Sequence, residues 1–328
     1  MNSKSTGLKS IAYELNLSIN TVSRALRDCD DISEATKEKV RQKAYELGYI
    51  PNNVSQFIKR DGKKLITVVV NSFKNSYFSI VCEKLVHIIS ELNYDFALVY
   101  SQKSKLDLDI LKQCISQRVD GIITLLEPED DDVIDTARLN NIPLVMLGRN
   151  VDKDYIDLVY TDDKLGGQLA AYYLINFHHL DKFVYIKLAN AECSRRRFDA
   201  FQKAVKELNS DAEIAVINQN QLNTKLIQLI HNQYYGLFCF NDELAYEALK
   251  ILNKEIPNVR KVLPRLHIVG YDCISTRING FTDLTSIDFD YDEICHTAVK
   301  FLLNRFENIK LEQQKIVFTV KLHQRKYI

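Results

Sequence analysis

The sequence predicts a chain of two parts, a small all-α unit followed by a larger α/β body of two Rossmann-like subdomains. Apolar residues recur at helical spacing three times within the first fifty positions, which indicates a short group of helices. From Leu65 onward, short β-branched runs alternate with amphipathic helices, a pattern typical of parallel sheets covered on both faces. Ten strand candidates are many for one open sheet, so we expect two subdomains.

The all-α unit is predicted to contain three helices. The first spans residues 8–15 and has one apolar face. Ser18 is placed to cap a second helix that runs to about Leu26. Ser33 can cap a third helix, which stops at Gly48. Three helices with a tight turn between the first two are typical of a helix-turn-helix unit.

A short linker is predicted between the two parts. Pro51 closes the helical unit, and the segment after it is polar and basic, with too few apolar residues to stay folded alone. The predicted organisation is therefore a helical domain at 1–50, a hinge or linker at 51–64, and a body at 65–328.

The elements of the body follow from the alternation of short apolar runs with helical patterns. Strands are predicted at 65–71, 94–100, 121–126, 142–147, 156–160, 182–187, 213–218, 235–240, 266–271 and 316–322. Helices are predicted at 77–92, 106–117, 131–140, 165–177, 195–208, 222–231, 243–252 and 292–306.

Charge is distributed unevenly along the chain. The formal net charge is zero, but residues 1–64 carry a net charge of +4 and the remainder a net charge of −4. A basic head on an acidic body suggests a local polyanionic partner, although an uneven split of this size also arises by chance.

Cysteine usage and the apolar runs exclude other classes of protein. The seven cysteines are odd in number and form no CxxC pair, which argues against a disulfide framework and a zinc ribbon. The N-terminus has no apolar signal region, and no apolar run approaches the ~20 residues of a membrane span. We expect a cytoplasmic protein with no membrane partner.

The second helix presents side chains that suit a DNA groove. Asn20 and Arg24 lie four residues apart and share a face. Asn can bond adenine through two hydrogen bonds and Arg can bond guanine in the same way. The hydroxyls of Thr21 and Ser23 can bond phosphates and fix the register. The alternative is a helical hairpin whose exposed polar face has no role.

Residues 8–52 resemble the DNA-binding head of the LacI/GalR family of bacterial repressors. The resemblance is carried by Leu8-Lys9-Ser10-Ile11-Ala12, Ser18-Ile19-Asn20-Thr21-Val22-Ser23-Arg24-Ala25-Leu26, Ile32 to Val40, and Leu47-Gly48-Tyr49-Ile50-Pro51-Asn52. It implies base contacts by Ile19, Asn20 and Arg24, and a hinge helix near 52–60 whose Ile58 wedges into the minor groove. The expected DNA-binding residues are Ser18, Ile19, Asn20, Thr21, Ser23, Arg24, Asn52 and Ile58.

The head departs from the family pattern at a few positions. Gly7 stands where the family usually has Thr, and Asn16 stands where it usually has Gly. Because Asn tolerates the left-handed backbone that such a turn needs, we expect the motif to survive. Ser55-Gln56 replaces a common Ala-Arg pair in the hinge.

The resemblance extends over the body through shorter motifs. They are Asn71 to Phe78, Arg118-Val119-Asp120-Gly121-Ile122-Ile123, Ile142 to Val145, Asp162-Asp163, Arg197 to Phe201, Phe240 to Ala245, Val269-Gly270-Tyr271-Asp272 and Leu284 to Ile287. The resemblance implies a periplasmic-binding-protein-like body with a ligand between its halves. It also implies that the chain crosses between the halves near 161, 289 and 318.

Candidate ligand contacts lie where strands end, which is where open α/β sheets bind ligands. Asn, Asp and Arg suit the hydroxyls of a sugar, and aromatic faces suit its C–H surfaces. The expected effector-binding residues are Phe73, Tyr77, Phe78, Arg149, Asp162, Arg197, Asn241 and Asp272. Alternatives remain for each: the charged groups can form ion pairs, Asn241 can cap a helix, and the aromatic rings can belong to the core.

Other motifs indicate no catalytic chemistry. His178-His179 resembles a pair of metal ligands, but no acid or Cys lies at ligand spacing, which favours a role at a helix end. Gly166-Gly167 lacks the spacing of a phosphate-binding loop. No Ser/His/Asp or Cys/His constellation is readable, so we expect neither an enzyme nor a bound cofactor or metal.

The combined expectation is an allosteric regulator, in which a small molecule changes the affinity for double-stranded operator DNA. A repressor and a sugar or sugar-derived effector are expected from the resemblance, while a purine or a protein co-regulator remains open. The chain ends at Ile328 with no heptad tail, so we expect a homodimer reading a pseudo-palindromic site. The competing hypotheses are a sugar-transport protein and a sugar-modifying enzyme.

Overall fold

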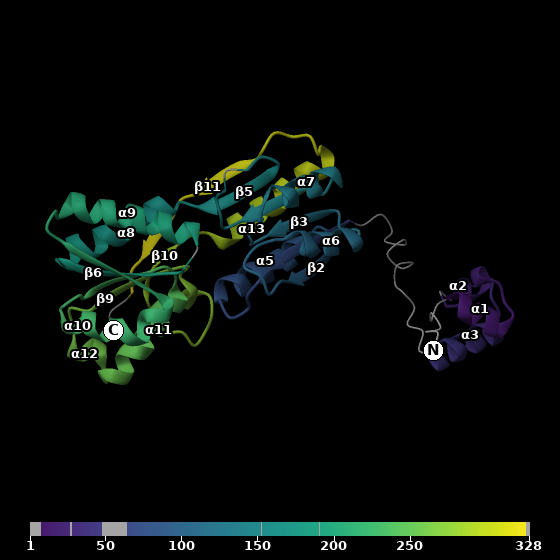
Figure 1. Ribbon diagram of the computed structural model, residues 1–328, viewed down its shortest axis with the longest axis horizontal. Coiled ribbons are helices and arrows are strands. Elements are labelled where there is room, and N and C mark those ends of the chain that lie inside the picture. Colours follow the sequence, from purple (N-terminus) through teal and green to yellow (C-terminus); the bar gives the residue numbers. More distant parts are fainter. Residues whose placement is uncertain (1–7, 27, 48–63, 152, 190, 326–328) are drawn as a thin grey trace. The chain divides into compact units, whose positions relative to one another are not determined.

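The computed structural model describes residues 8–26, 28–47, 64–151, 153–189 and 191–325. The chain divides into two compact units, Met1–Gly62 and Lys63–Ile328. Figure 1 shows the described part of the small unit as helices, and the larger unit as two blocks of strands and helices.

The described part of the small unit is a bundle of three helices. Its helices are α1 (Leu8–Leu15), α2 (Ile19–Leu26) and α3 (Glu34–Glu46). A shared apolar core is formed by Ile11, Ala12, Val22, Ala25, Val40 and Ala44. This core explains the spacing of the apolar residues, because each helix turns a single face toward the other two.

The turn between α1 and α2 has the conformation that the sequence predicts. Asn16 adopts a φ of 52°, in the left-handed region. Asn is one of the few residues other than Gly that visits this region readily, so the turn closes without a glycine. Ser18 Oγ then accepts a hydrogen bond from the backbone N–H of Thr21 at 3.0 Å, which confirms the predicted cap.

The first lobe of the larger unit is a six-stranded parallel sheet in the order β11-β5-β4-β3-β1-β2. Its strands are β1 (Leu65–Val70), β2 (Asp95–Tyr100), β3 (Gly121–Thr124), β4 (Leu144–Leu147), β5 (Ile156–Thr161) and β11 (Lys315–Phe318). Helices α5 (Ser76–Glu91) and α13 (Tyr291–Glu307) pack together on one face, and α6 (Leu108–Ser116) and α7 (Asp131–Leu139) cover the other.

The second lobe is built in the same way around the order β12-β10-β9-β8-β6-β7. Its strands are β6 (Lys182–Lys187), β7 (Glu213–Asn218), β8 (Gly236–Cys239), β9 (His267–Tyr271), β10 (Thr285–Asp288) and β12 (Lys321–His323). Only the β10–β12 pair is antiparallel among the described strands. The helices are α8 (Asp163–Tyr172), continued by a π-helical turn at Tyr173–Phe177, α9 (Glu192–Leu208), α10 (Leu222–His231), α11 (Asp242–Glu255) and α12 (Val259–Val262).

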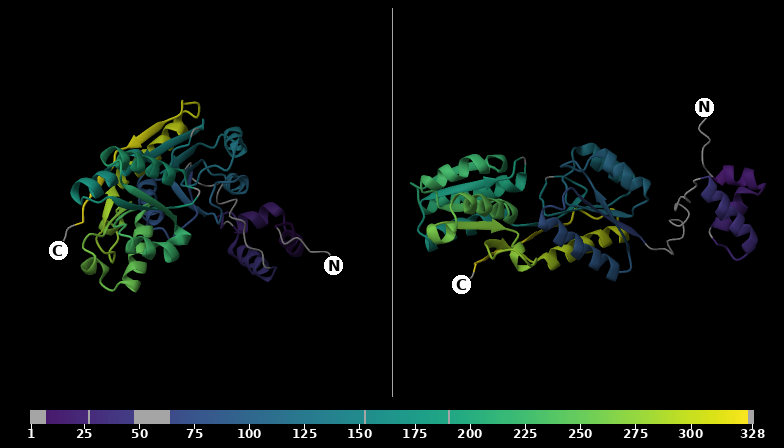
Figure 2. Two further views of the ribbon diagram at one scale, coloured as in Figure 1. Left: turned by 60° about the vertical axis from the view of Figure 1, so that its left-hand side comes forward. Right: turned by 90° about the horizontal axis from the view of Figure 1, so that it is seen from below.

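The chain passes between the lobes at three places. It leaves the first sheet after Thr161, returns to that lobe after Asp288, and leaves it again after Phe318. Figure 2 shows the two lobes from two further sides, each with helices flanking its strands. Two α/β lobes, each with a mostly parallel sheet, confirm the fold class predicted for the body.

Two strand predictions differ from the structure. The single strand predicted at 316–322 is two short strands, because β11 joins the first sheet and β12 joins the second. The sequence does not predict strand β10, because a strand of four residues, Thr285–Asp288, is too short and too polar to show an alternation of apolar and polar residues. All four are nonetheless buried.

Within the part of the chain that the structure describes, no helix has the length and apolar character that crossing a bilayer requires. The long helices are amphipathic instead, with one side in a core and the other in contact with solvent.

Candidate functional site

Helix α2 divides its side chains between the core and the surface. Val22 and Ala25 are fully buried, whereas Ile19 is 45% exposed. Asn20 is also exposed, and Arg24 is partly exposed on the same side of the helix. An apolar residue that remains exposed at the start of a short helix is available for an apolar contact such as a thymine methyl group.

The hydroxyls at the start of α2 serve the helix itself. Ser18 Oγ and Thr21 Oγ1 lie 2.8 Å apart and share a hydrogen bond. A hydroxyl has both a donor and two acceptor sites, so capping leaves these groups able to meet a phosphate. Ser23 is partly exposed on the helix. The predicted contacts Asn52 and Ile58 lie outside the described residues.

Arg24 is held by an acidic neighbour. Its Nη2 lies 2.6 Å from Oδ2 of Asp31, in the loop between α2 and α3. The hydrogen bond with Asp31 and the negative charge of Asp31 raise the pKa of Arg24, and the hydrogen bond with Arg24 and its positive charge lower the pKa of Asp31. The predicted base-reading side chain is therefore oriented by a second residue that sequence analysis did not single out.

A cavity of about 790 Å³ lies in the larger unit, where strands of both sheets end. The residues that line it follow β1, β3, β4, β6, β8 and β9, so both lobes contribute. They include Asn71, Ser72, Lys74, Tyr77, Phe78, Leu125, Glu127, Gly148, Arg149, Leu188, Cys193, Arg197, Phe240, Asn241, Glu243, Asp272 and Phe289. This volume is within the range of small-molecule sites.

Arg197 is the buried cation of this cavity. Its Nε donates to Oδ1 of Asp163 at 2.8 Å, and its Nη1 donates to the carbonyl oxygen of Phe240 at 2.7 Å. Its guanidinium also lies 3.4 Å from the ring centroid of Tyr271. Burial acts to lower the pKa of Arg197, but the carboxylate of Asp163 and further neighbours raise it overall. The guanidinium is thus a fixed, charged donor group.

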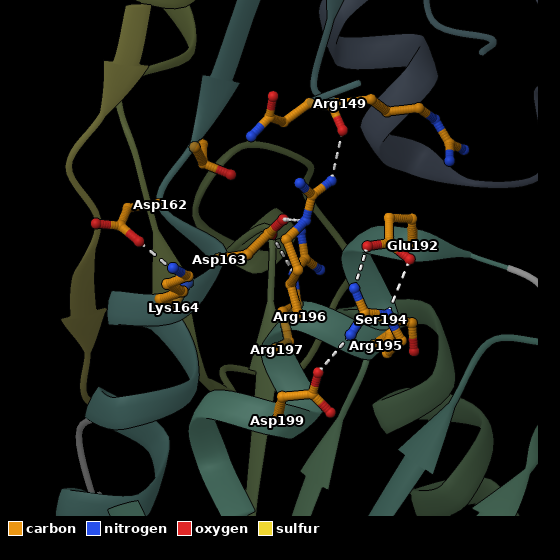
Figure 3. A network of polar contacts seen from close by, with 12 residues as sticks. Arg149, Asp162, Asp163, Lys164, Glu192, Ser194, Arg195, Arg196, Arg197 and Asp199 are labelled. Atoms are coloured by element: carbon orange, nitrogen blue, oxygen red, sulfur yellow. Dashed lines mark hydrogen bonds and ion pairs between the residues drawn. The ribbon is translucent and has the colours of Figure 1, made fainter. Parts of the chain in front are cut away.

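Close packing of two helices brings Arg197 and Asp163 together. Asp163 begins α8, and Arg197 lies on α9. A Cβ at Gly167 of α8 would lie 2.4 Å from the carbonyl oxygen of Arg197, so the helices approach at a distance that only glycine permits there. Figure 3 shows Asp163 directed toward Arg196 and Arg197.

Asp272 is a buried acid of the cavity. It follows β9 with a φ of 97°, and it is 7% exposed. Burial raises the pKa of its carboxyl well above the ordinary value, and Arg197 opposes that rise. A buried carboxyl beside a fixed guanidinium can accept hydrogen bonds from ligand hydroxyls, or donate one while it is protonated.

A second buried acid shapes the backbone around Asp272. Asp242 Oδ1 accepts from Ser286 Oγ at 2.6 Å, and its Oδ2 accepts from the backbone N–H of Ile274 at 2.8 Å. Burial raises the pKa of Asp242 to about 7, although these hydrogen bonds favour its charged form. A Cβ at Gly270 would lie 1.9 Å from Oδ1 of Asp242, so this arrangement needs a glycine there.

Asn241 both caps a helix and lines the cavity. Its Oδ1 accepts from the backbone N–H of Leu244 at 3.1 Å, which leaves its amide nitrogen able to donate elsewhere. The two roles that sequence analysis left open for Asn241 are therefore compatible.

Tyr77 and Phe78 line the same cavity from the first lobe, with ring centroids 5.5 Å apart.

Arg149 lines the cavity as one half of an ion pair. Its Nη1 lies 3.1 Å from Oε1 of Glu127, and its Nε donates to the carbonyl oxygen of Leu125 at 3.2 Å. Glu127 also lines the cavity. This pair offers a polar edge without a net charge.

Phe73 and Asp162 are not among the residues that line the cavity. Phe73 is 49% exposed, and its ring stacks on the ring of Tyr100 with centroids 5.6 Å apart. Asp162 caps α8, accepting from the backbone N–H groups of Lys164 and Leu165 at 3.0 Å each. Figure 3 shows Asp162 directed to Lys164 and away from the arginines. Of the two adjacent acids, Asp163 contacts Arg197, whereas Asp162, the predicted effector contact, caps the helix.

The contacts that join the lobes include two across the cleft that the sequence does not predict. Ser76, at the start of α5, donates its backbone N–H and its hydroxyl to Oε1 of Glu243, each at 2.9 Å. Arg196 donates from Nη2 to the carbonyl oxygen of Asn150 at 2.7 Å. Glu243 looks like an ordinary acid at a helix start, so no sequence signal distinguishes it.

The remaining candidates have structural explanations. His178 stacks on His267 with ring centroids 3.3 Å apart. Among the described residues, no group of three or more His, Cys, Asp or Glu side chains could hold a metal ion. The cysteines are free thiols, and all but Cys29 are buried.

The residues that line the cavity provide fixed donors, acceptors and aromatic faces that suit ligand binding.

Two family models match the chain. The model described as bacterial regulatory proteins, lacI family, matches residues 7–52. The model described as periplasmic binding protein domain matches residues 66–283. The first match covers the three-helix unit, and the second covers most of the two-lobed body.

Similar proteins match over nearly the whole chain. The HTH-type transcriptional repressor PurR of Photobacterium profundum is 24% identical over 330 residues, covering 98% of each chain. The lac repressor dimer bound to operator and the anti-inducer ONPF has a TM-score of 0.67 at 21% identity, covering 98% of each chain. A LacI family transcriptional regulator from Enterococcus faecium with bound ribose has a TM-score of 0.68 at 24% identity, covering 80% of this chain and 97% of that one.

Proposed function

Because the chain belongs to the lacI family of bacterial regulatory proteins, we propose that it is a repressor whose binding to an operator is controlled by a small molecule in the cavity of the body. The family consists of transcriptional regulators and not of enzymes. The observation that carries the proposal is the combination, in one chain, of a helix that exposes base-reading side chains and a cavity lined with buried charged groups.

The DNA contacts are assigned to α2. Asn20 and Arg24 read base edges, and Ile19 makes an apolar contact beside them. Ser18, Thr21 and Ser23 bond phosphates and fix the register. Support comes from the exposed position of this face, opposite the buried Val22 and Ala25.

The effector is a sugar or a sugar derivative. Arg197, Asp272 and Asn241 provide a fixed set of donors and acceptors for hydroxyls. Tyr77 and Phe78 offer aromatic faces for the C–H surface of a sugar ring. Support also comes from a similar structure whose chain holds ribose.

Effector binding is coupled to operator binding through two states of a cytoplasmic homodimer. A ligand shifts the balance between those states only by its difference in affinity for them, and the coupling is reciprocal. The operator is a pseudo-palindrome, because two heads related by two-fold symmetry read two half-sites.

The test measures DNA binding and effector response in one assay. Full-length protein is titrated against duplexes from upstream of its own gene and the neighbouring genes, at two salt concentrations, with and without a panel of sugars. The proposal expects tight, palindrome-specific binding that at least one sugar changes. Weak, sequence-blind binding that disappears as salt rises would contradict the repressor assignment.

Site variants separate the two halves of the proposal. Arg24→Ala should lose roughly 1–3 kcal/mol of sequence discrimination if its guanidinium makes a bidentate base contact. Asp272→Ala should leave operator affinity unchanged and abolish the response to the sugar. Normal sugar binding by Asp272→Ala would show that the cavity assignment is wrong.

A further inference from the structure

The turn after α2 brings an acid beside the base-reading arginine. The backbone N–H of Cys29 bonds the carbonyl oxygen of Arg24 at 3.2 Å, and the N–H of Asp28 bonds that of Ala25 at 3.2 Å. With Asp28 in the left-handed region at φ 60°, these two bonds form a Schellman motif. The motif ends the helix and folds the chain back along it, toward Arg24.

The loop that carries Asp31 is held on both sides. Before it, the carboxylate of Asp28 lies 2.8 Å from Nη2 of Arg41 and 3.1 Å from Nζ of Lys37, both on α3. After it, Ile32 packs against the apolar core of the bundle. The position of Asp31 is thus set by its neighbours, which reduces the entropy cost of orienting Arg24.

The contact constrains which edge of the guanidinium is available. Nη2 of Arg24 lies 2.6 Å from Asp31, and Nε is buried with no hydrogen-bond partner among the described residues. The donors that remain are the hydrogens of Nη1 and one hydrogen of Nη2. A two-pronged donor edge of this kind matches the O6 and N7 acceptors of guanine.

We propose that Asp31 is a positioning residue for Arg24, which holds the guanidinium in the orientation that prefers guanine at one base pair of each half-site. This inference rests on the proposed function, since it assumes that Arg24 faces a base. Asp31 itself touches no base. Its negative charge also opposes the phosphates, so it trades general affinity for discrimination.

The pair adds little to folding. The side chains of Arg24 and Asp31 are 41% and 54% exposed, and ion pairs this exposed contribute little to stability. Replacing Asp31 should therefore leave the thermal midpoint of the full-length protein unchanged, which makes the variant suitable for a binding test.

The experiment measures discrimination base pair by base pair. An operator duplex is first selected from a randomised pool by the full-length wild-type protein. Dissociation constants are then measured by fluorescence anisotropy, at one salt concentration, for that duplex and for every single base-pair change. The proteins compared are wild type, Arg24→Ala, Asp31→Ala, Asp31→Asn, the double variant of Arg24→Ala with Asp31→Ala, and Asp30→Ala.

The expected result is a localised loss. Arg24→Ala should remove the preference, roughly 5- to 150-fold in wild type, at one guanine position per half-site. Asp31→Ala should reduce the preference at that same position to a few-fold and leave other positions unchanged. The double variant should show the same loss of guanine preference as Arg24→Ala alone. Asp31→Asn should retain part of the preference, because its amide oxygen still accepts a hydrogen bond.

A matched control separates positioning from charge. Asp30 is an exposed neighbour of the same charge. Both Asp30→Ala and Asp31→Ala should bind random duplexes more tightly than wild type, but only Asp31→Ala should lose the guanine preference. A wild-type preference in Asp31→Ala, or an equal loss at every base pair, would overturn the inference while leaving the Arg24 assignment intact. Unchanged discrimination in Arg24→Ala would overturn both the role of Asp31 and the assignment of Arg24 to a base.

Discussion

The buried ion pair between Arg305 and Asp157 allows a sharp prediction of stability. Its side chains are 3% and 0% exposed, and Nε and Nη2 of Arg305 bond the two carboxylate oxygens at 2.8 and 2.7 Å. Gln314 donates its backbone N–H and its side-chain amide to the same carboxylate. The pair therefore joins α13, β5 and the segment before β11.

Arg305→Met should destabilise the larger unit strongly. The substitution leaves the carboxylate of Asp157 buried without its counter-charge, and breaking a buried pair in this way costs about 3–5 kcal/mol. For a unit of this size each kcal/mol lowers the melting temperature by roughly 2–4 °C, so a fall on the order of 10 °C is expected. The backbone carbonyls bonded by Arg305 also lose a donor.

The assay is chemical unfolding of the full-length protein, followed by circular dichroism because the chain has no Trp. Protein concentration is held fixed, since association would shift the midpoint. The matched control is Arg138→Met, which breaks an exposed pair with Asp135 and should cost less than about 1 kcal/mol.

A double variant tests the cause. Adding Asp157→Asn to Arg305→Met should restore part of the stability, because the buried charge is then gone. A loss below about 1 kcal/mol for Arg305→Met at neutral pH would refute the argument.

Three other predictions concern the body. Glu243→Ala removes the acceptor of both Ser76 hydrogen bonds, which join the two lobes. It should therefore weaken sugar binding roughly ten-fold by calorimetry and enlarge the radius of gyration in solution. If the affinity and the radius of gyration are both unchanged, Glu243 does not hold the lobes together. Burial and then His178 lower the pKa of His267 to about 4, below its unfolded value of about 6.5, so stability should fall as pH drops from about 6.5 toward 4. His267→Asn should flatten this acid limb in pH-dependent unfolding, whereas the exposed His87→Asn should not. Gly270→Ala should displace Asp242 and abolish the sugar response while operator binding persists, which the DNA titration measures; a retained response would count against the role given to Asp242.

Part of the cavity could be anticipated from sequence, and part could not. Arg197, Asn241 and Asp272 follow from the motifs and from the rule that ligands lie where parallel strands end. The sequence does not show that Asp162 caps α8 while Asp163 faces Arg197, because adjacent acids at a helix start compete for one capping position and either can take it. Phe73 shows the same limit, since an aromatic residue after a strand can face a cavity or pack on a surface ring.

The sequence by itself determined the helical head and the alternation of strands and helices in the body. These depend on contacts between residues close in the chain, such as the cap at Ser18 and the left-handed turn at Asn16. Only the tertiary structure decided which polar groups meet. Three contacts show this: Arg24–Asp31, Arg196–Asn150 and Ser76–Glu243. The distance between the partners of each pair depends on how loops and lobes pack. The periodicity of side chains along the sequence carries no information about that packing.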